Sequence, residues 1–339
     1  MFVTDRRPLA ATGLRLTALG LGTAALAGMY DAVDTATAHA TLAAAWDAGL
    51  RFIDTAPYYG FTRSERRVGE FLAERPRERA EAVLSTKVGR LMRPDATVAP
   101  GDNGFADPLP FRPVFDYAHD AILRSFEDSQ QRLGLARIDV LLVHDIGRAT
   151  HGERHVHHWK ALTAGGGFRA LERLRAEGRV GAIGLGVNEW EVIRDALGET
   201  RLDCALLAGR YTLLEQGALP FLDDCARQGL GIVVGGPFNS GLLAGQAKFN
   251  YEDAPADLVQ RAAALRAACA AHDVPLEAAA LQFPLAHPAV VSVLSGMRSP
   301  AQVAHNVAWF ERPLPGALWD ELRARGLLDA TAPCPAGGA

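Results

Sequence analysis

The sequence predicts an α/β fold in which eight parallel strands and their helices close into one (β/α)8 TIM barrel, with a short N-terminal hairpin and long βα loops. Short aliphatic and β-branched runs alternate with longer amphipathic segments, which is the pattern of strands and helices in turn. Nearly every strand-like run precedes a helix-like one, so the strands must be parallel, because each return has to cross over. Eight units at near-regular spacing favour closure into a barrel over an open doubly wound sheet.

The expected strands are apolar on both faces, as is typical of strands that have helices on one side and a packed interior on the other. They lie at residues 17–21, 51–54, 83–87, 140–144, 183–187, 204–208, 231–235 and 290–294. The main helical patterns between them lie at residues 39–48, 66–72, 116–133, 168–177, 258–272 and 300–310. The residues up to Leu16 are expected to form the hairpin that precedes the first barrel strand.

Two stretches depart from this rhythm. Residues 91–114 are rich in Pro, Gly and Asp, which predicts a long loop after the third strand. Loops that follow strand carboxyl ends line the active site of a barrel, so this stretch is the candidate substrate loop. The tail at about residues 330–339 contains Pro, Cys and a Gly-Gly pair and is expected to be flexible. Neither stretch has the core residues of a second domain, so residues 1–339 are expected to form a single domain.

Composition excludes several classes of partner. The chain has a net charge of −4 and no cluster of Lys and Arg interleaved with aromatic residues, which argues against nucleic acid. No apolar stretch approaches the roughly 18–20 residues needed to span a bilayer, so no membrane partner is expected. The remaining class of partner is a small molecule.

The cysteines and the amino terminus both predict a cytoplasmic protein. The four cysteines are scattered without a CxxC pair, which is typical of free thiols in a reducing compartment. Arg6-Arg7 and the apolar stretch at 18–28 resemble an export signal, but Pro8 follows the arginines directly. Gly20 and Gly22 interrupt the apolar stretch, which is better explained as the first strand and its glycine turn.

Polar residues stand at or just after the ends of four successive expected strands: Asp54, Lys87, His144 and Asn188. In a closed barrel all four point into one mouth. Taken singly, Asp54 and Lys87 are explained as a buried salt bridge and His144 as a core histidine. A polar group at the end of a buried strand is stable only when it is paired. Their joint placement favours a functional site.

Tyr59 lies on the loop above this mouth, five residues after Asp54. A tyrosine hydroxyl titrates near pKa ~10, and a nearby ammonium such as that of Lys87 stabilises the phenolate and lowers the pKa. A carboxylate keeps the lysine charged, and a histidine can hydrogen-bond the reacting oxygen. These residue types therefore predict a tuned acid–base relay. Tyr58 competes for the tyrosine role, and spacing alone does not separate the two.

Asp-Thr-Ala-Pro-Tyr-Tyr-Gly at 54–60, Thr-Lys at 86–87, Val-His at 143–144 and Gly-Leu-Gly-Thr at 20–23 closely resemble the aldo-keto reductases, over about residues 19–310. The resemblance implies a catalytic tetrad of Asp54, Tyr59, Lys87 and His144, and it assigns the proton-transfer role to Tyr59 instead of Tyr58.

The same resemblance implies a nicotinamide cofactor. Its contacts would fall on Gly22, Thr23, Asp54, Asn188, Pro237, Phe238, Ser240, Gly241, Gly296, Arg298, Gln302 and Asn306. The positions at which the family carries a lysine and an arginine that select NADP are Gly296 and Gln302 here. Losing two cations removes charge complementarity to the 2′-phosphate, which favours NAD over NADP, although Arg298 could still bind that phosphate.

Several stretches, including His-Asp at 144–145 and Gly-Pro-Phe-Asn-Ser-Gly at 236–241, are similar to the sugar and pyridoxal dehydrogenase branch of the family. This branch implies oxidation of an aldose, of the L-fucose or D-threo-aldose type, at C1 to the lactone. Pyridoxal 4-dehydrogenase and NADPH-dependent aldehyde reductase are the alternatives. The expected pocket walls are Tyr30, Tyr58, Phe111 and Phe115.

Two other interpretations remain open, and a metal site is considered beside them. A Schiff-base aldolase would use Lys87 as its nucleophile, and a non-catalytic barrel would bind nicotinamide as a regulatory module on a partner. The histidines at 151, 155, 157 and 158 crowd one stretch, but no carboxylate or cysteine spacing accompanies them, so no metal site is expected.

Overall fold

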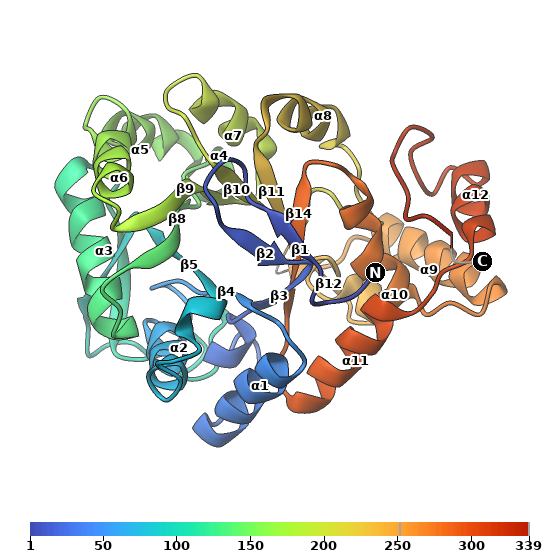
Figure 1. Ribbon diagram of the computed structural model, residues 1–339, viewed down its shortest axis with the longest axis horizontal. Helices are drawn as coiled ribbons and strands as arrows, with labels where there is room; N and C mark the ends of the chain where they lie inside the picture. The colour runs from blue at the N-terminus through green and yellow to red at the C-terminus, as the bar shows by residue number, and fades with distance from the viewer. Residues whose placement is uncertain (251, 338–339) are drawn as a thin grey trace.

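The computed structural model describes residues 1–250 and 252–337 and confirms the closed barrel. Its eight parallel strands follow one another around the ring in the order β10-β11-β14-β3-β4-β5-β8-β9, and Figure 1 shows the helices arranged outside them. The strands are β3 (Leu19–Gly22), β4 (Phe52–Asp54), β5 (Val83–Val88), β8 (Ile138–His144), β9 (Val180–Val187), β10 (Cys204–Ala208), β11 (Gly231–Gly235) and β14 (Val290–Gly296).

The helices cover the outside of the barrel in chain order. They are α1 (Thr35–Asp47), α2 (Arg63–Ala73), α3 (His119–Leu133), α4 (Arg148–His151), α5 (His155–Leu162), α6 (Gly167–Ala176), α7 (Trp190–Leu197), α8 (Leu219–Gln228), α9 (Ala256–Ala271), α10 (Leu276–Gln282), α11 (Pro300–Glu311) and α12 (Gly316–Ala324). Local chemistry sets some of their ends. Ser299 accepts a hydrogen bond from the Gln302 amide and Pro300 follows it, which starts α11. Gly134, at φ 65°, ends α3.

The amino-terminal hairpin is confirmed. Strand β1 (Arg6–Pro8) pairs antiparallel with β2 (Arg15–Thr17), and Figure 1 shows the hairpin across the centre of the barrel. Leu9 and Leu16 are buried with the inward-facing residues Phe52, Val140 and Val233. The hairpin therefore closes one end of the barrel and leaves the other end, where the strands finish, to form a site.

The expectation of an irregular loop at 91–114 is wrong at both of its ends. Strands β6 (Arg90–Pro94) and β7 (Phe111–Phe115) form an antiparallel hairpin, with Leu91 opposite Val114 and Met92 opposite Pro113. Proline conceals a strand pattern, yet a two-stranded ribbon tolerates it because its outer N–H groups need no partner. Between these strands, residues 95–110 contain the short 3₁₀ turn Asp102–Gly104.

The carboxyl-terminal segment is packed along part of its length. Ala332 is buried, and the Arg323 guanidinium donates to its carbonyl at 2.9 Å. Residues 338 and 339, where the expected flexible tail ends, lie outside the described residues. After β11, a third antiparallel pair joins β12 (Lys248–Phe249) to β13 (Glu252–Asp253).

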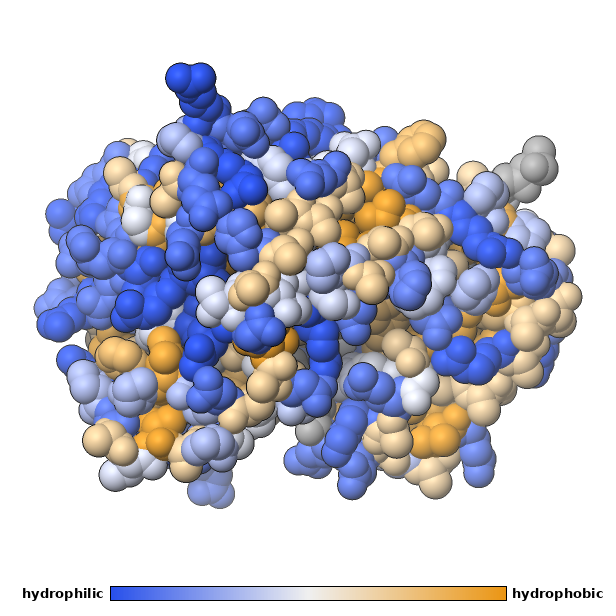
Figure 2. All heavy atoms as spheres, turned by 90° about the horizontal axis from the view of Figure 1, so that it is seen from below, coloured by the Kyte–Doolittle hydropathy of each residue, from blue (hydrophilic) through white to orange (hydrophobic). Residues whose placement is uncertain are grey.

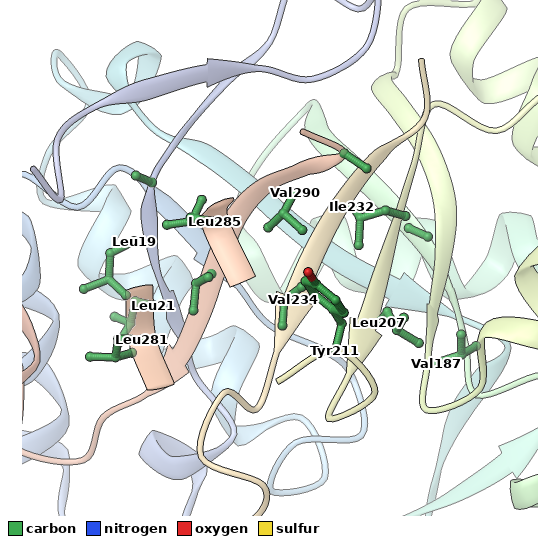
Figure 3. Close-up of a cluster of buried hydrophobic side chains, with 14 of the residues drawn as sticks. Leu19, Leu21, Val187, Leu207, Tyr211, Ile232, Val234, Leu281, Leu285 and Val290 are labelled. Carbon is green, nitrogen blue, oxygen red and sulfur yellow. The ribbon is translucent and has the colours of Figure 1, made fainter. Parts of the chain in front are cut away.

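The largest core cluster lies between the barrel and its helices. Figure 3 shows part of it, where Leu207, Ile232 and Val234 on β10 and β11 lie near Tyr211. Burial of such side chains removes apolar area from water, at roughly 25 cal/mol per Å². On the face shown in Figure 2, hydrophilic residues predominate and apolar ones form small scattered groups. No helix among the described residues has the length and apolarity that crossing a membrane requires.

Candidate active site

A cavity of about 650 Å³ opens at the carboxyl ends of the barrel strands. Lys87 near the end of β5, His144 at the end of β8 and Val187 at the end of β9 line it. Parallel strands all finish at this face, so residues far apart in the sequence meet there. The volume is that of a small-molecule site.

Beneath the cavity, Asp54 and Lys87 form a fully buried ion pair. The Lys87 ammonium donates to Asp54 Oδ2 at 2.7 Å and to the Thr55 carbonyl at 2.9 Å. The Ser85 hydroxyl donates to the other Asp54 oxygen at 2.6 Å. Each side chain is only 2% exposed. A pair buried so completely persists only when further hydrogen bonds satisfy both ions, as they do here.

Tyr59 lies against Lys87, while Tyr58 does not. The ammonium is 4.7 Å from the centroid of the Tyr59 ring, whereas the Tyr58 ring packs under the Arg90 guanidinium at 4.2 Å. The Tyr59 ring also meets the His144 ring edge-on, with centroids 5.8 Å apart. The structure thus brings the four predicted tetrad residues together, with Tyr59 in the place beside the lysine.

The pKa of Tyr59 moves in the direction opposite to the one expected from the sequence. Burial raises it well above its usual value, and the carboxylates of Asp54 and Asp145 raise it further, against a partial lowering by Arg90. Burial is the main physical reason, and the Lys87 ammonium, which the sequence predicts to lower this pKa, donates instead to Asp54 and the Thr55 carbonyl. In the cofactor-free protein, Tyr59 therefore keeps its proton at neutral pH.

His144 is neutral at physiological pH. Burial lowers its pKa well below the usual value, and the cations Arg90 and Lys87 lower it further. A neutral imidazole carries one N–H donor and one bare nitrogen acceptor. His144 can therefore hydrogen-bond an uncharged or a developing anionic oxygen in the cavity.

Sequence reasoning missed an ion pair in the cavity wall. Arg90 donates to Asp145 Oδ2, and Asn188 donates to Asp145 Oδ1 at 3.2 Å. Both Arg90 and Asp145 line the cavity. Arg90 lies next to a stretch that the sequence predicts to be a loop. The one available signal was that Asp145 directly follows His144, the histidine predicted for the tetrad.

The expected pocket walls divide into two pairs. Tyr30 and Tyr58 line the cavity as predicted. Phe111 and Phe115 are not among the described residues that line it, because hairpin pairing commits them elsewhere. Phe115 meets the His151 ring edge-on at 4.6 Å. Phe111 packs with the small cluster around Phe105.

The expected cofactor residues lie around the mouth, on the loops after β3, β9, β11 and β14. Asn188 lines the cavity itself. Gly22 and Gly296 are register partners at the ends of β3 and β14, and Gly296 leads to Arg298 and Gln302 at the start of α11.

The loop at 236–241, with Pro237, Phe238, Ser240 and Gly241, follows β11. Its last three residues adopt left-handed backbone, with φ of 48° at Asn239, 57° at Ser240 and 98° at Gly241. Within this loop, Asn239 donates its backbone N–H to the Gly236 carbonyl and Gly241 donates to the Phe238 carbonyl, each at 3.0 Å. The loop is therefore a tight turn that closes on its own hydrogen bonds directly after β11.

Two of the expected contacts are engaged within the fold. The Thr23 hydroxyl donates to the Asp54 carbonyl at 2.7 Å and contacts the Ser64 hydroxyl at 2.6 Å. The Asn306 amide donates to the Ser295 hydroxyl at 2.9 Å. Both residues are buried, so their side chains hold the loops in place.

The donor groups at this mouth suit a nicotinamide dinucleotide. The amino terminus of α11, which is the positive end of the helix dipole, lies at this mouth and is a favourable setting for phosphate. Gly296 is exposed, and a Cβ there would meet only the Ala25 Cβ at 3.8 Å, so a ligand has room to approach the strand end. Asn188 presents its amide to the same cavity that Lys87 and Tyr59 line.

A closed parallel barrel with an Asp–Tyr–Lys–His cluster at its strand ends is the arrangement of a barrel oxidoreductase. The model of the Aldo/keto reductase family matches residues 18–325, and the chain belongs to that family. It is an oxidoreductase that acts on CH–OH groups, and the family implies NAD or NADP as cofactor.

Two curated relatives match nearly the whole chain. A pyridoxal 4-dehydrogenase from Microbacterium luteolum is 52% identical over 339 residues, covering 96% of this chain and 98% of that protein. A D-threo-aldose 1-dehydrogenase from a Pseudomonas species is 43% identical over 329 residues, covering 94% and 97%. Among solved structures, an aldo-keto reductase from Bacillus halodurans in its holo form superposes with a TM-score of 0.73, at 25% identity, over 97% of this chain and 98% of that one.

Proposed function

We propose that this protein is a dehydrogenase that oxidises the cyclic hemiacetal of pyridoxal to a lactone, with NAD as its preferred cofactor. The observation that carries the proposal is the 52% identity to a pyridoxal 4-dehydrogenase across nearly all of both chains. The sequence favoured an aldose and held pyridoxal as the alternative. The comparisons support the alternative better, because the aldose enzyme is the more distant relative at 43%.

The two substrate classes share one reaction. Pyridoxal and aldoses both close internally to hemiacetals, in which the former aldehyde carbon carries one hydrogen and one hydroxyl. Removing that hydrogen as hydride and the hydroxyl hydrogen as a proton leaves a C=O bond, which is a lactone. One reduced nicotinamide and one proton are released for each lactone formed.

In this proposal Tyr59 takes the hydroxyl proton. An oxidised nicotinamide held at the mouth would supply the acceptor for the hydride, and its positive charge would favour the phenolate form of Tyr59, whose pKa burial raises. Lys87 lies against the Tyr59 ring and stabilises the phenolate, while Asp54 holds the lysine charged and in place. His144 hydrogen-bonds the reacting oxygen.

The cavity wall suits a planar heteroaromatic ring. Tyr30, Tyr58, Met29 and Leu206 present aromatic and apolar surface to the cavity, which favours the flat face of a pyridine over a ring covered with hydroxyls. Arg90 adds a cation at the same wall, and its guanidinium is able to donate to the ionised ring oxygen of pyridoxal.

The preference for NAD rests on the lack, among the described residues, of a free cation near α11 that could bind the 2′-phosphate of NADP. Arg298, which could otherwise bind a 2′-phosphate, forms an ion pair with Asp31. Its backbone amide donates to the Gln302 side chain at 2.9 Å. Gly296 contributes no side chain. The mouth therefore offers little free positive charge to a 2′-phosphate.

Two earlier alternatives are poorly supported by the site. A Schiff-base nucleophile must be an accessible neutral amine, whereas Lys87 is 1% exposed and donates to a carboxylate and a carbonyl. A non-catalytic barrel would not need the four tetrad residues brought together around a cavity. We further infer one barrel domain acting on a small molecule in a reducing cytoplasm, since the four cysteines of the described chain are free thiols.

The proposal is tested by initial rates with pyridoxal, L-fucose, D-arabinose and L-galactose, each with NAD and with NADP. We expect pyridoxal with NAD to give the highest kcat/KM. A higher kcat/KM for an aldose would show instead that the protein is an aldose 1-dehydrogenase. Brisk reduction of simple aldehydes without oxidation of any hemiacetal would contradict the dehydrogenase assignment.

A further inference from the structure

Asp145 shares the cavity with His144, although it is the next residue along the chain. Successive side chains of a strand point to opposite faces, so an extended Asp145 would point away from the cavity that His144 enters. Instead Asp145 adopts left-handed backbone, with φ at 45°. This conformation turns its carboxylate back to the side of the histidine, and both residues line the cavity.

Neighbouring groups hold this backbone in place. The Asp145 amide donates to the Gly186 carbonyl at 2.9 Å. The buried Tyr117 hydroxyl reaches the His144 carbonyl at 2.9 Å and the Asp145 carbonyl at 3.3 Å. A left-handed residue with a side chain is strained where glycine would not be. Glycine would adopt this backbone without strain, but it would bring no carboxylate to the cavity.

The carboxylate is anchored on both oxygens. Oδ1 accepts from the Asn188 amide at 3.2 Å, and Oδ2 accepts from the Arg90 guanidinium. The same Oδ2 lies 3.5 Å from His144 Nε2. The other ring nitrogen, His144 Nδ1, is buried without a hydrogen-bond partner among residues 1–250 and 252–337.

This asymmetry selects a tautomer. A neutral imidazole carries its single proton on one nitrogen, and the partner of each nitrogen decides which. A carboxylate beside Nε2 attracts the proton there, while no acceptor among the described residues attracts it to Nδ1.

We propose that Asp145 is a positioning residue that keeps the proton of His144 on Nε2, so that the histidine presents an N–H donor to the oxygen of the substrate. Asp145 also fixes the amide of Asn188, one of the expected cofactor contacts. The catalytic consequence rests on the proposed function, since it requires a substrate oxygen beside His144. The tautomer itself does not.

The charged and titratable groups that face Asp145 come from several elements. They are Lys87 of β5, Arg90 of β6, Tyr58 and Tyr59 of the loop after β4, Tyr117 of the segment before α3, and His144 of β8. Burial raises the pKa of Asp145, while Arg90 and Lys87 partly lower it. As the pH falls through this raised pKa, Asp145 becomes neutral and its hold on the His144 proton is lost.

The direct test is ¹⁵N NMR of the histidine-labelled full-length protein, with the His144 signal assigned by its loss in His144→Asn. We expect the wild type to show a protonated Nε2 and a bare Nδ1. In Asp145→Asn we expect the signal to move to the other tautomer or to a mixture. A protonated Nδ1 in the wild type, or an unchanged tautomer in Asp145→Asn, overturns the proposal. No substrate is needed, so this readout is independent of the proposed function.

Kinetics test the consequence. We expect Asp145→Asn to lower kcat by about 10- to 100-fold, the usual effect of losing a group that orients a functional histidine, while KM changes less than about threefold. The fall of wild-type kcat on the acid side should disappear in the variant. An unchanged kcat and pH profile would overturn the role of Asp145 in turnover.

A matched control lies on the same strand. Asp139 of β8 is buried and pairs with Arg79 at 2.8 Å, but it faces away from the cavity. Asp139→Asn also leaves a mostly buried arginine unpaired, and it should leave the tautomer and the kcat profile as in the wild type. Equal kinetic loss in both aspartate variants would reduce Asp145 to a structural role and contradict the proposal. If Asp145→Asn fails to fold, adding Arg90→Gln removes the unpaired charge and the NMR comparison is repeated.

Discussion

At the scale of single residues, the site depends on which charges are already engaged. Lys87 donates to Asp54 and to the Thr55 carbonyl, so Tyr59 experiences burial and two nearby carboxylates more strongly than the ammonium. Asp54, Lys87 and His144 could be singled out from the sequence because each lies at a strand end, whereas only the family resemblance favoured Tyr59 over Tyr58. Asp145 could not, because the left-handed turn that brings it into the cavity leaves no trace in an apolar pattern.

Removing the Tyr59 hydroxyl tests its assignment against Tyr58. We expect Tyr59→Phe to reduce kcat/KM by about 10²- to 10⁴-fold, the usual contribution of a general acid–base group. Tyr58→Phe is the matched control and should stay within a few-fold of the wild type, because its ring packs under Arg90 and not beside Lys87. Absorbance of the reduced nicotinamide measures both, and a reversed order would reassign the proton transfer to Tyr58.

The raised pKa of Tyr59 predicts opposite pH dependence for the two directions of the reaction. Oxidation needs the phenolate to accept a proton, so its kcat should rise with pH through the neutral and alkaline range. Reduction needs the phenol to donate a proton, so it should not rise there. Initial rates of oxidation and of reduction, measured from about pH 6 to about pH 10, check this. The range extends to the ordinary pKa of a tyrosine, about 10. Oxidation that declines steadily above neutrality would contradict the prediction.

At the scale of elements, the features that the sequence did not predict lie in the βα loops. The hairpin of β6 and β7 was hidden by Pro94 and Pro113, because proline is evidence against a central strand and says nothing against a two-stranded ribbon. That hairpin delivers Arg90 to the cavity. The bounds of the barrel strands were predictable to within a few residues. Each strand is a short apolar run, and such a run can be recognised from the local sequence alone.

The start of α11 should control cofactor choice. Gly296 is exposed with space for a side chain, so Gly296→Lys combined with Gln302→Arg introduces two cations at the mouth. We expect the ratio of kcat/KM for NADP to that for NAD to rise by about tenfold or more, on the order of one charge-assisted hydrogen bond. Gly296→Gln with Gln302 retained is the uncharged control. No change in the ratio would place cofactor selection elsewhere.

At the scale of the whole molecule, the barrel buries histidines in their neutral form. Desolvation and neighbouring cations lower the pKa of His144 well below its usual value, and that of His151 from 6.5 to about 4. The unfolded chain takes up protons on these rings below about pH 6.5, while the folded chain does not. Stability is therefore fully present above pH 6.5 and declines as the pH falls toward the folded values.

Chemical unfolding at pH 7.5 and at pH 5 measures this loss. Each such histidine contributes about 1.4 kcal/mol per pH unit to the slope of the unfolding free energy. His151→Gln does not titrate, and its side-chain amide is able to donate to the Tyr117 hydroxyl oxygen, which lies 2.9 Å from His151 Nε2. The variant should therefore show a slope lower by about that amount. An unchanged slope would show that His151 is not buried in its neutral form.

The most direct measurement of the central claim is the stoichiometry of products formed from pyridoxal and NAD, by mass spectrometry of the oxidised product together with absorbance of the reduced nicotinamide. The account predicts one lactone for each reduced nicotinamide in the wild type, and the same product at a rate lower by about 10²-fold or more in Tyr59→Phe. Formation of the open-chain acid in place of the lactone, or equal rates in the two proteins, would contradict it.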